Sequence, residues 1–300
     1  MVDISRGTTG IVLPKAVSQE IWQNTQEQSL IQRLVPSMPL PGGGVDVPII
    51  TGDPVAAWTA ETAEKPVSRS TFGSKNIKGY TLAVIEPFSN QFRRDLPALY
   101  GALVQRLPLA LARTFDRTAL GFQASPGSGF DTLAAAPSVS LASVPEDPGP
   151  PVVPATTAYD GFLGALSSVA TNGGDLSAWA LSTQAEIAAL GSKDAQGRPL
   201  FLESVTNEGT VTRVLGRPVT MSKNVYDTTP NPDVLGFGGD WQSARWGYVE
   251  GIKVDIADQA TLNDGGTPLN LWQRNMFAVR VEFEIGFVVR DVNRFVKLTA

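Results

Sequence analysis

The chain has no histidine and no cysteine among its 300 residues. Their absence excludes a Ser-His-Asp or Cys-His nucleophilic pair, a Cys/His zinc site, a thiol redox centre and a disulfide. An enzyme that works through carboxylates alone, such as a glycosidase with paired acids, is still compatible with the composition. Most of the common catalytic chemistries are therefore excluded before any motif is considered.

Charge is also scarce, since Asp, Glu, Lys and Arg make up 18% of the residues, against about 25% in a typical soluble domain. Hydrophobic residues account for 42% and the formal net charge is −5. So little charge favours a protein that buries much of its surface against partners. The acidic balance argues against a basic face that reads a nucleic-acid sequence.

Long hydrophobic runs are missing as well. No stretch approaches the roughly eighteen consecutive apolar residues of a membrane-spanning helix. The first residues, Met1 to Gly7, lack the basic and apolar regions of a signal peptide. We therefore expect a non-secreted protein without a membrane span.

The clearest pattern that is present lies near the C-terminus, where apolar residues occupy every second position from Phe277 to Phe287. A period of two sustained over this length predicts a long β-strand with one buried face. Such a strand has to pair with chain from much earlier, so it ties both ends of the protein into one domain. The segment 290–298 is expected to form a second short strand or an extended tail of the same kind.

A long amphipathic helix is predicted from Asp95 to Phe122, with Asp95 as its cap and an internal Pro108 that should bend it. Arg106, Arg113 and Arg117 lie together beside its apolar stripe. Two interpretations of these arginines stay open at this point. They form a solvated or salt-bridged flank, or they contact nucleic acid or a neighbouring subunit.

Residues 45–92 show two extended arms around a polar segment, which predicts a long β-hairpin. Its tip carries Glu61, Glu64, Lys65 and Arg69 and has little to bury. An isolated hairpin of this length is marginal in water. We therefore expect the hairpin to rest on another surface, most naturally a neighbouring subunit.

The rest of the chain divides into three parts. Residues 14–35 read as one or two amphipathic helices, and the proline-rich stretch 123–157 reads as a long connection. Residues 159–256 alternate strands with short helices, including a helix at 159–171 and another that Ser182 caps. This alternation predicts a compact α/β subdomain inserted between the long helix and the terminal strand.

Several short sequence motifs occur in a characteristic order along the chain. They are Asp53-Pro54-Val55-Ala56-Ala57-Trp58, Leu82-Ala83-Val84-Ile85-Glu86-Pro87-Phe88-Ser89, Gly216-Arg217-Pro218-Val219, Gly238-Gly239-Asp240-Trp241 and Arg274-Asn275-Met276-Phe277. Taken together, they resemble the major capsid proteins of tailed bacteriophages with the Hong Kong 97 fold, particularly the short form found in phages of actinobacteria. Each string is unspecific alone, and the signal lies in their order over nearly the whole chain.

The resemblance implies an α+β fold in five segments. These are an N-terminal arm at 1–41, an extended hairpin called the E-loop at 42–90, the first part of a P-domain with its long spine helix at 91–155, an α/β A-domain at 156–256, and C-terminal P-domain strands at 257–300. In the prototype a protease removes a long N-terminal scaffolding segment, whereas the arm here begins almost at Met1. A separate scaffold, no scaffold, or an already mature product would each account for this difference.

The resemblance also implies a function. The expected protein is a structural one, not an enzyme, with no cofactor and no metal, that assembles in the host cytoplasm into pentamers and hexamers of an icosahedral virion shell. Its expected partners are copies of itself and packaged double-stranded DNA bound without sequence specificity; scaffold, portal and decoration proteins are further candidates. The prototype joins an E-loop lysine to a P-domain asparagine. Lys65, Lys75 and Lys78 lie in the E-loop here, but no motif fixes the asparagine, and we do not expect the crosslink.

Three alternatives remain. An encapsulin-like compartment shell would have the same fold with a protein cargo. A carboxylate-dependent hydrolase would use acids such as Asp240 or Glu250, which are more simply read as turn and surface residues. Another virion part, such as a decoration or tail protein, is not expected to place a long helix between an E-loop and an α/β insertion.

Overall fold

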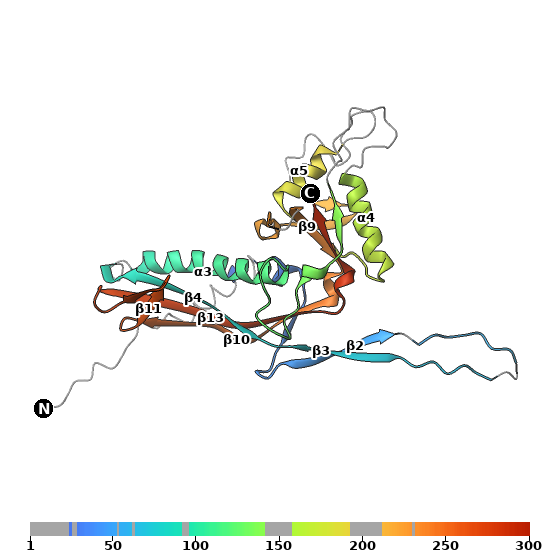
Figure 1. The fold of residues 1–300 in the computed structure, drawn as a ribbon, viewed down its shortest axis with the longest axis horizontal. Helices are drawn as coiled ribbons and strands as arrows, with labels where there is room; N and C mark the ends of the chain where they lie inside the picture. The colour runs from blue at the N-terminus through green and yellow to red at the C-terminus, as the bar shows by residue number, and fades with distance from the viewer. Residues whose placement is uncertain are drawn as a thin grey trace.

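The computed structural model describes residues 24–25, 29–52, 54–61, 64–91, 96–141, 158–192, 212–229 and 232–300. Two separate sheets, one of four strands and one of six, form the two halves of an elongated subunit, and a hairpin projects from between them (Figure 1). The part of the expected helices before residue 24, the cap at Asp95 and residues 142–157 of the expected connection lie outside the described residues.

The four-stranded sheet has the order β1-β10-β13-β4. Its strands are β1 (Ser37–Pro39), β4 (Tyr80–Ser89), β10 (Ala244–Ala257) and β13 (Met276–Val289). β13 lies in the middle and pairs antiparallel with both β10 and β4. The six alternating apolar residues from Phe277 to Phe287 are each at most 2% exposed, which confirms the predicted long strand with one buried face.

The spine helix, α3 (Leu96–Ala119), lies along one face of this sheet (Figure 1). It continues through Pro108 and buries Leu107, Leu111 and Phe115. The Phe115 ring meets the ring of Phe287 edge-on, with 6.5 Å between the ring centroids. Each fully buried apolar side chain of this size contributes roughly 1.5–3 kcal/mol. The contact between helix and sheet is therefore the main core of this half.

The six-stranded sheet has the order β5-β14-β9-β6-β8-β7. Its strands are β5 (Ser138–Ser140), β6 (Ala178–Leu181), β7 (Arg213–Val214), β8 (Arg217–Met221), β9 (Val234–Gly239) and β14 (Phe295–Thr299). The helices α4 (Ala158–Thr171) and α5 (Thr183–Gly191) pack on it, as predicted. Ser182 caps α5 by accepting a hydrogen bond from the amide of Ala185. Gly173, at φ 69°, ends α4 in the left-handed region.

Two strands lie in the other sheet from the one that the sequence suggested. The segment from Ala244 to Ile256, expected in the α/β part, belongs to β10 and pairs with β13. β14, which the resemblance assigned to the C-terminal P-domain strands, pairs with β9 and β5. Alternation shows that a strand has one buried face, but it does not show which sheet covers that face. The chain changes sheets at two short 3-10 turns, Trp241–Ser243 and Val292–Arg294.

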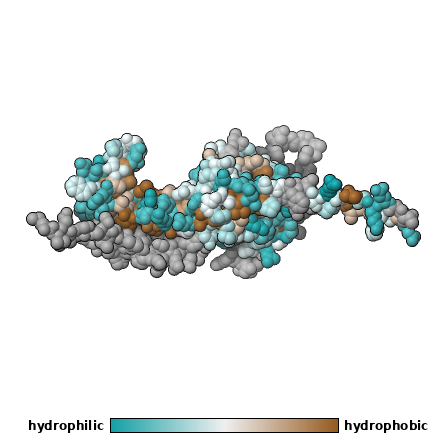
Figure 2. Space-filling model, turned by 90° about the horizontal axis from the view of Figure 1, so that it is seen from below, coloured by the Kyte–Doolittle hydropathy of each residue, from teal (hydrophilic) through white to brown (hydrophobic). Residues whose placement is uncertain are grey.

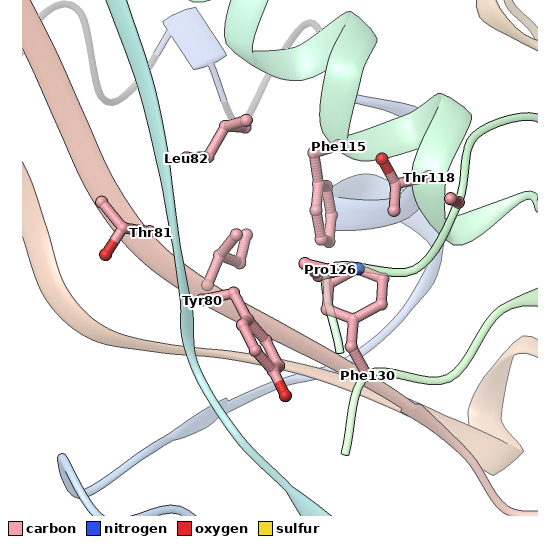
Figure 3. A pocket seen from close by; sticks show the side chains of 9 residues that line it. Tyr80, Thr81, Leu82, Phe115, Thr118, Pro126 and Phe130 are labelled. Carbon is pink, nitrogen blue, oxygen red and sulfur yellow. The ribbon is translucent and has the colours of Figure 1, made fainter. Parts of the chain in front are cut away.

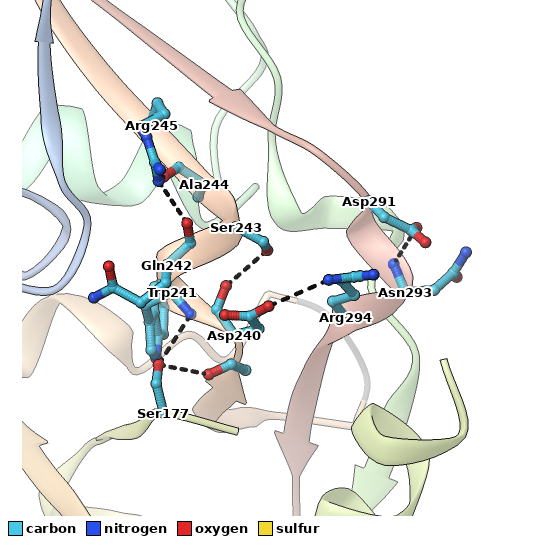
Figure 4. Close-up of polar contacts among 11 residues, drawn as sticks. Ser177, Asp240, Trp241, Gln242, Ser243, Ala244, Arg245, Asp291, Asn293 and Arg294 are labelled. Atoms are coloured by element: carbon cyan, nitrogen blue, oxygen red, sulfur yellow. Dashed lines mark hydrogen bonds and ion pairs between the residues drawn. The ribbon is translucent and has the colours of Figure 1, made fainter. Parts of the chain in front are cut away.

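These two turns are bonded to each other where the sheets meet (Figure 4). The Asp240 amide donates to the Arg294 carbonyl at 3.1 Å, and the Arg294 guanidinium lies 3.4 Å from the Asp240 carboxylate. The Arg290 amide donates to the Ser243 carbonyl at 3.1 Å. Both chain crossings are therefore fixed at a single junction.

Two hairpins complete the fold. β2 (Val45–Gly52) and β3 (Thr71–Ile77) form a projecting hairpin that is shorter than the predicted one at 45–92, because the chain beyond Gly79 forms β4 and pairs with β13. β11 (Thr261–Asp264) and β12 (Thr267–Asn270) form a second hairpin, which the sequence analysis missed. Its turn contains Gly265 and Gly266, both with positive φ. An Asp-Gly pair between short strands is a recognised hairpin signal that would have predicted it.

A buried carboxylate joins the N-terminal segment to both halves. Asp116 of α3 is fully buried and accepts hydrogen bonds from the Ser29 hydroxyl at 2.7 Å and the Leu30 and Ile31 amides at 2.9 and 3.2 Å, at the start of α2 (Leu30–Leu34). The Asn224 side-chain amide donates the fourth bond at 2.9 Å. Burial raises the pKa of the Asp116 carboxyl, and the four hydrogen bonds only partly oppose that rise.

Replacing Asp116 with alanine should lower the free energy of unfolding by about 3 kcal/mol, because it leaves several buried donors without an acceptor. Urea unfolding of the unassembled subunit measures the change. Glu61→Ala, which removes an exposed carboxylate, is the matched control and should change stability by less than about 0.5 kcal/mol. Equal effects of the two substitutions would contradict the assignment.

Candidate assembly surfaces

The β2–β3 hairpin is anchored firmly at its base. The Lys75 ammonium donates to the Asp131 carboxylate at 2.8 Å and to the Val289 carbonyl at 2.6 Å. The Val289 amide donates to the same Asp131 oxygen at 3.0 Å, and the Lys78 amide donates to the Gly129 carbonyl at 3.0 Å. These bonds tie the hairpin to the end of β13 and to the loop after α3, so they fix the direction in which it projects.

Beyond that base the hairpin makes few contacts with its own subunit. The four predicted tip residues, Glu61, Glu64, Lys65 and Arg69, are all exposed. Val55, Trp58 and Val67 are also exposed, and Trp58 is fully so. Figure 2 shows the hairpin as a thin arm that bears both hydrophobic and hydrophilic residues. Large apolar side chains on a two-stranded arm are typical of a surface that a partner covers.

The three E-loop lysines differ in their surroundings. Lys75 holds the hairpin base through its bond with Asp131. Lys65 and Lys78 are exposed. The ammonium of Lys75 therefore has a structural role inside the subunit, whereas Lys65 stands at the tip.

The arginines of α3 fall into two groups. Arg106 and Arg113 are exposed and lie two turns apart on one side of the helix. Arg117 points inward, lies 2.6 Å from the Asp227 carboxylate and covers the Phe122 ring. Burial alone would raise the pKa of Asp227, but hydrogen bonds from Thr229 and the Arg117 charge hold it below its usual value. Arg117 thus joins the spine helix to the α/β half.

The acids considered for a hydrolase do not form a paired site. Asp240 is bonded to Arg294 at the junction of the sheets, whereas Glu250 is exposed on β10 opposite Glu284.

A cavity of about 90 Å³ between α3 and β4 is lined mainly by apolar side chains, among them Tyr80, Phe115 and Phe130 (Figure 3), and by no carboxylate. Within the described ranges no cluster of three or more acidic residues could hold a metal ion. No helix in those ranges is long and apolar enough to cross a membrane.

A long helix on an antiparallel sheet, a separate α/β half and a projecting hairpin together define a Hong Kong 97-like shell protein. The model of the phage capsid family matches residues 9–300, and the chain belongs to this family.

Individual relatives agree with this assignment. The chain is 34% identical over 289 residues to a probable major capsid protein of Mycobacterium phage L5, covering 94% of this chain and 87% of the relative. A solved structure from Gordonia phage Cozz matches with a TM-score of 0.68 and 26% identity, covering 91% of this chain and 86% of that one. A structure from Mycobacterium phage Adephagia has a TM-score of 0.70 at 18% identity over 90% and 89%, which supports the fold alone.

Replacing Arg117 with alanine should destabilise the subunit by roughly 2 kcal/mol, because it leaves the nearly buried Asp227 charge unpaired. Arg113→Ala, on the exposed side of the same helix, is the matched control and should have little effect. Because the pKa of Asp227 is lowered in the folded state, its contribution is present at neutral pH and is lost as the pH falls through that lowered value. The difference between wild type and Arg117→Ala in urea unfolding should therefore shrink in acid, and a constant difference would contradict the pairing.

Proposed function

We propose that this major capsid protein builds the icosahedral phage head by laying its β2–β3 hairpin over an adjacent subunit. The observation that carries the proposal is the contrast between the two ends of the hairpin. Its base is tied to Asp131 and Val289, whereas its tip exposes Val55, Trp58 and Val67. The arm is therefore held in one direction and is left with apolar surface to bury.

Burial of the tip would supply much of the contact energy. A tryptophan buries about 150–250 Å², so burying Trp58 alone is worth roughly 4 kcal/mol. A contact of this kind joins two different surfaces of two copies. Repeating the contact closes a ring when the rotation between neighbouring copies is a whole fraction of a full turn. In the proposed shell these rings are hexamers and pentamers, with the α/β halves meeting around the axes.

The division into an N-terminal arm at 1–41, an E-loop at 42–90, a P-domain at 91–155 and 257–300 and an A-domain at 156–256 is part of the proposal. Strand pairing supports a modified boundary, because β10 lies in the sheet under the spine helix and β14 lies in the α/β sheet. β5, within the proposed 91–155 segment, also lies in the α/β sheet. The proposed P-domain segments thus supply two strands to the α/β sheet, and the proposed A-domain segment supplies one strand to the four-stranded sheet.

The proposal includes contact with packaged double-stranded DNA through Arg106 and Arg113. Both are exposed on one side of α3, and such contacts with phosphate carry no sequence information. Arg117 is left out because it is engaged with Asp227. The proposal also places assembly in the host cytoplasm and includes scaffold, portal or decoration proteins as further partners. The family match and the named relatives favour a phage shell over an encapsulin-like compartment.

Deleting residues 61–70 should leave a subunit that folds but does not form particles. The deletion removes the hairpin tip and leaves the anchoring bonds of Lys75 and Lys78 in place. Negative-stain microscopy and sedimentation measure assembly, and circular dichroism with urea unfolding checks the fold. Formation of normal shells by this variant would contradict the proposal.

Replacing both Arg106 and Arg113 with alanine should still allow particles to form, and these particles should bind their DNA more weakly. Loss of two phosphate contacts should lower the salt dependence of binding by roughly two counterions per subunit. The salt dependence is measured from the release of DNA by opened particles over a series of salt concentrations. Particles of Arg117→Lys, which keeps the charge pair, serve as the control. A salt dependence that matches wild type would remove these arginines from the DNA contact.

A further inference from the structure

A cleft of about 280 Å³ opens between the base of the β2–β3 hairpin and the four-stranded sheet. Val47 and Pro48 of β2 form one wall, and Val288 of β13 lies on the floor. The other wall is polar and begins in the turn Trp241–Ser243, where the chain changes sheets. This volume approaches the lower end of the roughly 300–1,000 Å³ that small-molecule sites occupy. The cleft therefore has room for a small organic molecule.

The cleft follows from the way the hairpin meets the sheet. Gly247 of β10 and Gly286 of β13 are paired partners. A Cβ atom on Gly286 would lie 2.4 Å from the Lys78 carbonyl oxygen, so the hairpin base rests on this position only because it is glycine. Two residues along β13 the sheet again carries side chains, Val288 and its partner Arg245, and the cleft lies between them and β2.

The cleft lies on the face of the sheet that points away from the spine helix. The Phe287 ring meets the Phe115 ring of α3, and successive side chains of a strand point to opposite faces, so Val288 points away from α3. Figure 1 shows the hairpin and α3 on opposite sides of the sheet. A ligand in the cleft is therefore separated from the exposed arginines of α3, such as Arg113.

Two arginines line the cleft, Arg245 on β10 and Arg290 directly after β13. The Arg245 Nη1 donates to the Gln242 carbonyl at 2.5 Å (Figure 4) and to the Ala244 carbonyl at 2.7 Å, which fixes the guanidinium. Within the described residues no acceptor is bonded to its Nε or Nη2. Two neighbouring N–H groups of this kind hold a phosphate or carboxylate through two parallel hydrogen bonds. Arg245 is therefore prepared for an anion.

The chemistry of the lining favours a ligand with two negative charges and an apolar part. Among the described residues that line the cleft there is no Asp or Glu, so the lining is positive. A phosphate monoester carries a charge of about −1.5 to −2 at pH 7, whereas a carboxylate carries a single charge. The apolar surfaces of Val47, Pro48 and Val288 match an apolar group on the same ligand.

We propose that this cleft binds a small phosphate monoester with an apolar body. The phosphate lies against Arg245 and Arg290, and the body lies against Val47 and Pro48. Such a ligand touches the hairpin and the sheet at once, so its binding favours the direction in which the hairpin projects here. The inference goes beyond shell building and is tested on the unassembled subunit.

Calorimetric titration at low ionic strength with three probes tests the ligand class. Phenyl phosphate has the charge and the ring, inorganic phosphate has only the charge, and phenol has only the ring. Phenyl phosphate should bind with a Kd of about 1 mM or below. Inorganic phosphate should bind about tenfold more weakly, and phenol should give no measurable heat. Equal binding of the two phosphates, or no binding of phenyl phosphate, would overturn the proposal.

Substitutions in the polar wall locate the site. Arg245→Gln should weaken phenyl phosphate binding by about 30-fold, because a charge-assisted pair of hydrogen bonds is lost. Arg245→Lys should weaken it nearly as much, since lysine cannot form two parallel bonds. Gln242→Glu adds a negative charge to the lining with almost no change of shape and should weaken binding by about tenfold. It also provides the measurement if the Arg245 variants do not fold, which urea unfolding shows.

Arg113→Gln, on the α3 side of the sheet, is the matched control and should bind phenyl phosphate as wild type does. Unchanged binding by Arg245→Gln or Gln242→Glu, or an equal loss in Arg113→Gln, would overturn the assignment of the site. Excess duplex DNA should not displace phenyl phosphate, because each phosphodiester carries a single charge. Displacement by duplex DNA would assign the cleft to DNA and overturn its assignment to a small molecule.

This proposal and the proposed function fail in different ways. Deleting residues 61–70 leaves both walls of the cleft in place, so that variant should bind phenyl phosphate as wild type does whether or not it forms particles. Particle formation therefore tests the role of the hairpin in assembly, and phenyl phosphate binding tests the cleft.

Discussion

The pairing of β13 with β4 and β10 is the constraint on which the rest of the subunit depends. One face of β13 carries the apolar side chains that the spine helix covers, and the Phe115 and Phe287 rings meet there. Its last residue, Val289, holds the base of the projecting hairpin through Lys75 and Asp131. The Val288 side chain, one residue earlier, points to the opposite face and forms the floor of the cleft beside the hairpin. A single strand therefore positions the core, the hairpin and the cleft.

A second set of contacts joins the two halves of the subunit. Consecutive residues of α3 point to different partners, since Asp116 receives the start of α2 and the Asn224 amide, and Arg117 pairs with Asp227. Arg294 and Asp240 join the two chain crossings at the other side of the boundary. The two halves are thus joined by buried and partly buried polar contacts, which are specific in geometry.

Much of the fold was predictable because its signals are local. The period of two in β13, the Ser182 cap of α5 and the Gly173 end of α4 depend on neighbours in sequence, and all three are present. Sheet membership was not predictable, because neither the alternation in β10 nor the short apolar run of β14 shows which sheet the strand joins. The inward turn of Arg117 likewise depends on Asp227, 110 residues away. The four candidate tip residues are exposed on the hairpin, and their contact with a neighbouring subunit stays a prediction.

The low charge of the chain and its exposed Trp58 and Trp272 have a common physical explanation. A monomer that had to remain dispersed would cover such sites with charged residues, since large exposed apolar groups promote association. Exposed apolar side chains lie on the hairpin and at other points such as Leu109 and Ile187, whereas the exposed face of β10 and β13 carries ion pairs such as Arg280 with Asp255. Exposed pairs of this kind add little stability, but they keep that face from sticking indiscriminately. In the proposed assembly, a neighbouring subunit covers the exposed apolar groups of the hairpin, and a contact between unlike surfaces extends an ordered shell instead of an aggregate.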